Sequence, residues 1–196
     1  MGYSFPDLSA LAALMLWPAI PLFWVPVHCA PAFFRRLGLF TYVLPAVTWL
    51  PLAYVLFTMR DSLLGSRIAL TPLVNGFGAL LLLIGIGLQV WTAVLLRLQI
   101  MGIPEVSNAA AGRMITAGPF AVVRHPTYLS HTLMLLGSFL WTEVTALFFA
   151  TVIDALVVNA VIIPLEEREL QKRFGKEYEA YRRQVPNRIL PLPRFR

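Results

Sequence analysis

Residues 73–96 read LVNGFGALLLLIGIGLQVWTAVLL, and this uncharged stretch decides the fold. An apolar helix of about 20 residues is long enough to cross a hydrocarbon core of roughly 30 Å. The whole chain has the same character, since 58% of its 196 residues are hydrophobic and only 13% are charged. A soluble domain rarely has so apolar a composition. We therefore expect a multi-pass integral membrane protein.

Five segments have the apolar character of membrane crossings and predict an all-α protein with five transmembrane helices. The first contains Pro18, Pro21 and Pro26, which predict a kink or a break. The fourth is short for a full crossing, so we expect it to tilt or to lie partly in the cytosolic leaflet. The five segments cover about residues 8–29, 39–59, 74–98, 126–141 and 144–164.

Small residues and short connections predict how these helices pack. The fourth and fifth segments are joined by WTEV, residues 141–144, which is typical of a helical hairpin. Glycines on a membrane helix allow a neighbouring helix to approach closely. The third segment has four that we expect to do so: Gly76, Gly78, Gly85 and Gly87.

Basic residues predict the orientation. Of the 16 Lys and Arg residues, all except Arg60 and Arg67 fall after the first segment, between the third and fourth, or after the fifth. The positive-inside rule places those three regions in the cytosol and the N-terminus outside. It also explains the net charge of +6 through anionic headgroups, so we expect no nucleic-acid partner. One cysteine and three scattered histidines predict no metal site.

The chain divides into two halves by composition. Residues 1–98 are expected to hold the first three transmembrane helices, and residues 99–196 the catalytic half. The second half comprises a cytosolic connector at 99–124, the hairpin at 126–164, a polar helix at 165–183 and a proline-rich tail. The connector and the polar helix share the cytosolic face and flank the hairpin.

The stretch RHPTYLSH, residues 124–131, puts charge and imidazole at the mouth of a membrane helix. Pro126 suits the first turn of a helix, so Arg124 and His125 precede that turn, beside free N–H groups. Tyr128 then lies on the same side as His125. A ligand site explains this grouping. The alternative is that Arg124 anchors to headgroups and Tyr128 belongs to the interfacial aromatic belt.

The stretch LEEREL, residues 165–170, follows the fifth segment and brings two carboxylates to the cytosolic face. Glu166 is seven residues beyond Asn159, which predicts that both lie on one helical stripe. The alternative is a helix–helix hydrogen bond at Asn159 and a solvated glutamate pair. Two further polar groups are expected to be structural, with Asp154 either interfacial or partnered by a group such as Gln89. His28 is expected at the membrane interface.

Three spaced motifs carry a family resemblance over roughly residues 105–193. They are RHPTY at 124–128, EEREL at 166–170, and FGKEYEAYRRQVP at 174–186. Together they resemble the isoprenylcysteine carboxyl methyltransferase family, and more broadly the integral membrane methyltransferases that include phospholipid methyltransferases. The small five-helix form is similar to the prokaryotic and archaeal members. The resemblance implies S-adenosylmethionine as the cofactor and S-adenosylhomocysteine as the product.

The resemblance also implies roles for individual positions. Glu166 is expected to hold a polar group of the cofactor. In the related eukaryotic enzymes an arginine one turn earlier is thought to engage the substrate carboxylate, and Ile162 stands there in this chain. The expected substrate-positioning residues are therefore Arg124, Asn159 and Glu167, with Arg168 as a further candidate. The remaining residues expected against the cofactor are Arg113, Met114, Ile115, Phe120, His125, Pro126 and Tyr128.

The predicted activity is methyl transfer to the carboxylate of a lipid-like, isoprenylcysteine-type acceptor. A carboxylate is already ionised at pH 7, so catalysis needs alignment and exclusion of water rather than a general base. A lipophilic or prenylated acceptor would enter from the bilayer, and the cofactor from the cytosol. The alternatives are a membrane-embedded NADPH-dependent sterol-type reductase, a phospholipid N-methyltransferase that must deprotonate an amine, and a protein without enzymatic activity.

Overall fold

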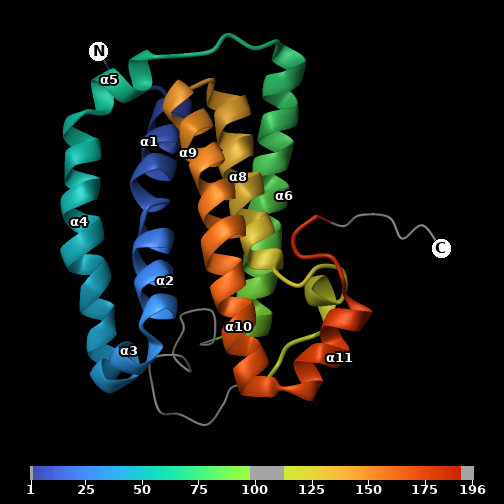
Figure 1. Cartoon of the computed structure of the whole chain (residues 1–196). Helices are drawn as coiled ribbons and strands as arrows, with labels where there is room; N and C mark the ends of the chain where they lie inside the picture. The colour runs from blue at the N-terminus through green and yellow to red at the C-terminus, as the bar shows by residue number, and fades with distance from the viewer. Residues whose placement is uncertain (1, 98–112, 191–196) are drawn as a thin grey trace.

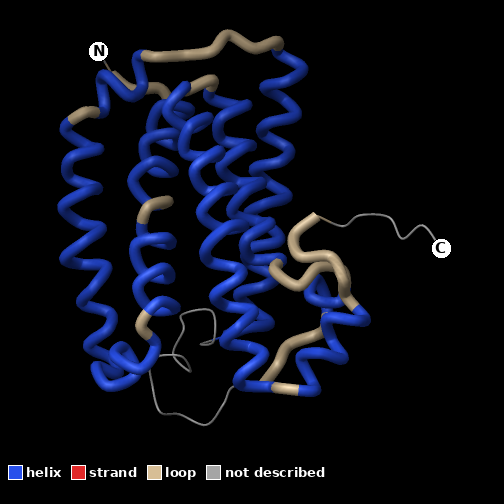
Figure 2. The backbone as a smooth tube through the Cα atoms, in the orientation of Figure 1, coloured by secondary structure: helices blue, strands red, loops and turns tan. Residues whose placement is uncertain are grey.

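The computed structural model describes residues 2–97 and 113–190, and Figure 1 shows their course. These two ranges are built from helices and contain no strand; one isolated β-bridge pairs Arg67 with Val144. Figure 2 shows the same arrangement, a bundle of nearly parallel helices. The predicted boundary between residues 98 and 99, most of the predicted connector and the last six residues lie outside the described residues.

The first predicted crossing is a broken helix, as its prolines indicated. Helix α1 (Phe5–Leu16) starts at a Ser4 capping box and gives way to α2 (Ala19–Cys29) at Pro18. A short helix α3 (Pro31–Leu37) and a 3-10 turn η1 (Gly38–Tyr42) then reverse the chain. Helix α4 (Val43–Thr58) returns along the outside of α1 and α2 (Figure 1). It has a single buried residue, Ala53.

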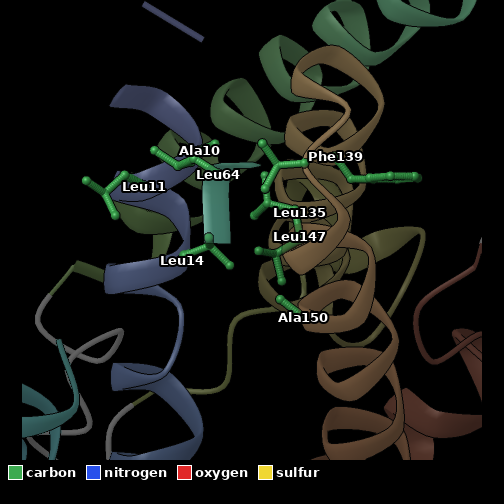
Figure 3. Packing of buried hydrophobic residues seen from close by; sticks show 9 residues of the cluster. Ala10, Leu11, Leu14, Leu64, Leu135, Phe139, Leu147 and Ala150 are labelled. Atoms are coloured by element: carbon green, nitrogen blue, oxygen red, sulfur yellow. The ribbon is translucent and has the colours of Figure 1, made fainter. Parts of the chain in front are cut away.

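The centre of the bundle is a close pair of helices. After α5 (Arg60–Gly65), helix α6 (Pro72–Leu96) runs the length of the molecule and packs against α8 (Pro126–Thr142). Helix α8 turns at Glu143 into α9 (Thr145–Val157), which confirms the predicted hairpin. Residues of α1, α5, α8 and α9 form a shared apolar core, shown in Figure 3, in which Leu147 is fully buried.

Glycines set the distance between α6 and α8. A Cβ added to Gly78 would lie 2.6 Å from the backbone nitrogen of Trp141, and one added to Gly85 would lie 2.9 Å from that of Met134. The close approach predicted at these two positions is confirmed. It is wrong for Gly76 and Gly87, which have no neighbour within 4 Å of the added atom.

The last long helix changes its winding where it leaves the bundle. Helix α9 runs into a π-helical turn, η4 (Val158–Ile162), and continues as α10 (Ile163–Phe174). The expected polar helix over 165–183 is not one helix. It breaks at Gly175, whose φ of 53° lies in the left-handed region that favours glycine, and resumes as α11 (Lys176–Gln184).

In the described ranges, four helical stretches are long and apolar enough to cross a membrane. They are Phe5–Cys29, Pro31–Thr58, Pro72–Leu96 and Thr145–Phe174. The predicted fourth crossing, α8, has only 17 residues and is not among them, although it lies among α1, α6 and α9 inside the bundle. Helix α6 exposes large apolar side chains, including Leu73, Leu83 and Val94, as a lipid-facing helix does.

Asp154 and Gln89, the two polar side chains expected inside the membrane helices, have other partners than each other. The indole Nε1–H of Trp17 donates to Asp154 Oδ1 at 2.8 Å, so the break between α1 and α2 supplies the partner of this buried carboxylate. Gln89 instead accepts a hydrogen bond from the hydroxyl of Ser130 and ties α6 to α8. Gln89 is therefore not the partner of Asp154.

Candidate functional site

One cavity stands out at the end of the bundle where α10 and α11 lie (Figure 1). Its volume is about 430 Å³, within the range of roughly 300–1,000 Å³ common for small-molecule sites. Helices α2, α6, α8, α10 and α11 contribute to its wall, as does the 3-10 turn η3 (Gly118–Ala121). It brings together eight of the predicted site residues: Arg113, Met114, Ile115, Phe120, Arg124, His125, Tyr128 and Glu166.

The start of α8 is fixed by the chain segment after α11. Pro126 occupies the first turn, as predicted; it is buried and is not among the residues that line the cavity. The backbone N–H of Arg124 donates to the carbonyl of Asn187 at 3.0 Å, and that of His125 to the carbonyl of Arg188 at 2.9 Å. These two N–H groups are therefore engaged by the segment after α11.

Arg124 lies inside the protein, not at the headgroups. Its Nε and one terminal nitrogen donate to Glu167 Oε1 at 3.0 and 2.7 Å. The other terminal nitrogen donates to the carbonyls of Val185 and Pro186. The second oxygen of Glu167 accepts from Arg188 at 2.9 Å. Arg124 and Glu167 thus clamp α8, α10 and the segment after α11 together, and Glu167 does not line the cavity.

His125 stands between the two glutamates. Its Nδ1 lies 3.6 Å from Glu166 Oε2, and its Nε2 lies 3.4 Å from Glu167 Oε1. Burial alone would lower the pKa of His125, but the two carboxylates outweigh it and raise the pKa above its ordinary value. Glu166 Oε2 is buried and accepts no hydrogen bond within the described part of the chain. Its charge is compensated by His125 at 3.6 Å, and Glu166 is one of the residues that line the cavity.

Two tyrosines of α11, Tyr178 and Tyr181, line the cavity. The Tyr181 hydroxyl donates to the carbonyl of Phe120 at 2.7 Å, and burial raises the pKa of Tyr181 to about 12. Tyr178 is almost fully buried, and burial also raises the pKa of its hydroxyl. That hydroxyl has no hydrogen-bond partner among the described residues. The position of α11 therefore adds a second unsatisfied polar group to the wall.

The sequence prediction missed the wall that α2 provides. Ile20, Trp24 and His28 line the cavity from the first broken helix. His28, which was expected at the membrane interface, is buried within the protein, with only 8% of it exposed. Its Nδ1 lies 2.9 Å from Glu169 Oε2, and its ring stacks on Trp24. The four-residue spacing of these positions is the signal that could have found them, because it places them on one face of a helix.

Asn159 is not brought to the cavity. The π-helical turn η4 contains one residue more than an α-helical turn would, which rotates the following chain by about 100° relative to the preceding one. Asn159 is exposed, and its amide donates to the carbonyl of Ala155 at 2.8 Å. The predicted common stripe of Asn159 and Glu166 is therefore wrong. Ile162, which stands where the related eukaryotic enzymes have the arginine, is fully buried.

Comparison with known proteins gives the class to which this fold and site belong. A family model described as phospholipid methyltransferase matches residues 74–177, which is more than half of the chain. The chain belongs to this family, as the resemblance of its motifs indicated. The match runs from α6 into α11 and does not include the α2 wall.

Curated relatives include methyltransferases of one named kind. A protein-S-isoprenylcysteine O-methyltransferase from Schizosaccharomyces pombe is 32% identical over 87 residues, covering 41% of this chain and 34% of the relative. Protein-S-isoprenylcysteine O-methyltransferase B from Arabidopsis thaliana is 23% identical over 118 residues, covering 59% of each. The isoprenylcysteine methyltransferases are therefore relatives of this chain, which matches only part of their length.

A relative of a different kind is a Delta(14)-sterol reductase from Mus musculus. It is 26% identical over 96 residues, which cover 47% of this chain and 22% of the reductase. No solved structure matches the chain.

Proposed function

We propose that this protein is an S-adenosylmethionine-dependent methyltransferase that acts on the carboxylate of a lipid-like, isoprenylcysteine-type acceptor. One observation carries the proposal: Glu166, whose Oε2 is buried without a hydrogen bond and pairs with His125 at 3.6 Å, lines a cavity of ligand size within the part of the chain that matches the methyltransferase family. A buried carboxylate oxygen without a hydrogen bond is costly, and a polar ligand removes that cost.

The residues around the cavity fit the cofactor. Glu166 would accept hydrogen bonds from its ammonium or its ribose hydroxyls, and Arg113 would pair with its carboxylate. Phe120 and Tyr128 offer aromatic surface beside them. When bound, S-adenosylmethionine supplies a methyl group already activated by a sulfonium. The other residues proposed to lie against it are Met114, Ile115 and His125, with Pro126 fixing the start of α8.

The protein's own contribution is then mainly alignment. Arg124 and Glu167 act by holding α8 against α10, because their polar atoms are engaged with each other and with the segment after α11. We place them among the positioning residues rather than in contact with the acceptor. A carboxylate acceptor needs no general base, so exclusion of water and the orientation of the two substrates supply most of the rate enhancement.

The proposed membrane arrangement keeps the five crossings, the external N-terminus and a cytosolic active site. Helix α8 would be the fourth of these crossings along the chain, since its 17 residues lie inside the bundle and need not match the bilayer alone. Residues 1–98 would carry three crossings, and residues 99–196 most of the site. The N-terminal half would also contribute to the site, because α2 forms part of the cavity wall.

The test is calorimetric titration of S-adenosylhomocysteine into the detergent-purified full chain. We expect micromolar binding that Glu166→Ala weakens at least about tenfold, the effect of losing one or two charge-assisted hydrogen bonds. Glu177→Ala is the matched control, because that glutamate is exposed on α11. A folded wild-type protein that binds no S-adenosylhomocysteine would overturn the proposal.

The sterol reductase relative makes an NADPH-dependent reductase the second candidate. NADPH is therefore titrated under the same conditions, and binding of NADPH without S-adenosylhomocysteine would favour the reductase. An assay with a farnesylated cysteine and with phosphatidylethanolamine then separates carboxylate methylation from amine methylation.

A further inference from the structure

The cavity contains a histidine that the family match does not cover. His28 lies in the last turn of α2, and its side chain is 3% exposed. Its Nδ1 faces Glu169, which as a carboxylate can only accept, so Nδ1 carries a proton. His28 is among the residues that line the cavity, and its Nε2 is buried without a hydrogen-bond partner among the described residues. A purely structural tie between α2 and α10 accounts for Nδ1 but leaves Nε2 unexplained.

The imidazole is held in place from two sides. Trp24 stacks on it with ring centroids 5.2 Å apart and an angle of 16° between the rings. Glu169 holds Nδ1 at 2.9 Å. A carboxylate behind a histidine fixes the orientation of the ring. Glu169 also lies 3.8 Å from Arg35, so its negative charge is shared between two basic groups.

The rest of the α2 wall shows what kind of ligand would reach His28. Ile20, Trp24 and His28 are four residues apart and line the same cavity, so two apolar side chains lead along the helix to one polar group at its end. An amphiphile with an apolar tail and a polar head matches this order. The tail would lie along Ile20 and Trp24, and the head would meet Nε2.

Charge decides which head group fits. A carboxylate placed in a partly apolar cavity needs a cationic or donor partner. Arg124 cannot serve, because Glu167 and two carbonyls occupy its nitrogens. His125 already lies between Glu166 and Glu167. Arg113 is assigned above to the cofactor, and Arg173 has a partner of its own. His28 has one carboxylate behind it and a buried nitrogen without a hydrogen-bond partner among the described residues.

We propose that His28, oriented by Glu169 and Trp24, is the residue that binds the carboxylate of the methyl acceptor, with Ile20 and Trp24 receiving the start of its lipid tail. With a proton on each ring nitrogen, His28 donates from Nδ1 to Glu169 and from Nε2 to the acceptor. This assignment rests on the proposed function. It gives the N-terminal half of the chain a direct part in selecting the acceptor.

The first experiment compares two substitutions of His28. The amide of His28→Asn reaches the position of Nδ1 and keeps the bond to Glu169, whereas the amide of His28→Gln reaches the position of Nε2. With N-acetyl-S-farnesylcysteine as acceptor, we expect His28→Asn to raise KM about tenfold and His28→Gln to restore most of the loss. The Kd for S-adenosylhomocysteine should stay within about twofold of wild type in both variants. Cys29→Ser, an exposed neighbour, is the control.

The second experiment uses the wild-type protein, so its result does not depend on whether a variant folds. The chain has three histidines, so the ring nitrogens of His28 can be assigned after ¹⁵N-histidine labelling. N-acetyl-S-farnesylcysteine should shift the His28 Nε2 resonance, and its uncharged carboxamide should not.

The outcomes separate this assignment from the proposed function. An unchanged KM in His28→Asn, or a cofactor Kd that weakens by the same factor, would overturn the role of His28 in an otherwise working methyltransferase. Equal resonance shifts with the acid and the carboxamide would also overturn it. A wild-type protein without S-adenosylhomocysteine binding would overturn the proposed function instead, and the resonance would still report whether the acid reaches His28.

Discussion

Substituting Gly137 by alanine should separate the two central helices. A Cβ at this position of α8 would lie 2.5 Å from Leu82 N, 2.7 Å from Gly78 O and 2.9 Å from Leu82 Cα. All three are backbone atoms of α6, so no side-chain rotation can make room. The helices must move apart by about 1 Å to restore ordinary contact distances near 3.5 Å. The contact runs along most of α8, so the movement loosens packing well beyond the substituted residue.

The expected loss follows from two opposing effects. Overpacking costs about 1–3 kcal/mol, and alanine recovers at most about 1 kcal/mol of helix propensity over glycine. Subtracting the full propensity gain, we expect Gly137→Ala to lower the free energy of unfolding by about 0–2 kcal/mol. Gly87→Ala on α6 faces open space and should be neutral or slightly stabilising.

The assay is SDS-induced unfolding in mixed micelles, followed by far-ultraviolet circular dichroism. Both variants and the wild type are compared at one lipid composition. Equal stability of Gly137→Ala and Gly87→Ala would refute the close backbone contact between α6 and α8.

Three further changes probe the polar groups. Glu167→Ala leaves the buried guanidinium of Arg124 without its carboxylate. It should lower the free energy of unfolding by about 3–5 kcal/mol in the same assay. A loss below about 1 kcal/mol, typical of an exposed pair, would contradict the buried clamp. His125 has a raised pKa in the folded protein, so the stability it contributes is present below its ordinary value of 6.5 and lost as the pH rises through the folded value. Thermal unfolding from pH 6 to 9 should therefore show a steeper decline for wild type than for His125→Asn, and parallel curves would argue against the raised pKa. Trp17→Phe removes the indole donor to buried Asp154 and should cost about 1–3 kcal/mol; an unchanged SDS midpoint would show that the bond contributes nothing.

Much of the bundle could be predicted because its signals are local. Long apolar runs gave the helices, the prolines of the first segment gave the break near Pro18, and WTEV gave the hairpin turn. RHPTY and Glu166 meet at one cavity, as the motifs indicated, because Pro126 fixes the start of α8 and α10 lies beside it. The five-crossing count could not be read with the same certainty, since α8 is short and lies within the bundle.

The misses depend on contacts between distant parts of the chain. The residues around His28 do not predict its contact with Glu169, which lies 141 positions later in the chain. The carbonyls that occupy the N–H groups of Arg124 and His125 come from residues 187 and 188. The role of Asn159 was misjudged for a local reason, because an α-helical period was applied across a π-helical turn. Helical periodicity assigns faces correctly only while the winding stays constant.

The π-helical turn at Val158–Ile162 also affects how this chain aligns with its relatives. Such a turn arises when one residue is inserted into an α-helix without breaking it. A relative that lacks the turn should therefore align with a one-residue gap here, while its residues on either side remain in register with α9 and α10. A loss of one residue at this place would not shorten the protein noticeably, but it would swing Glu166 and Glu167 by about 100° away from His125. The length of this segment, and not only its chemistry, is thus under constraint.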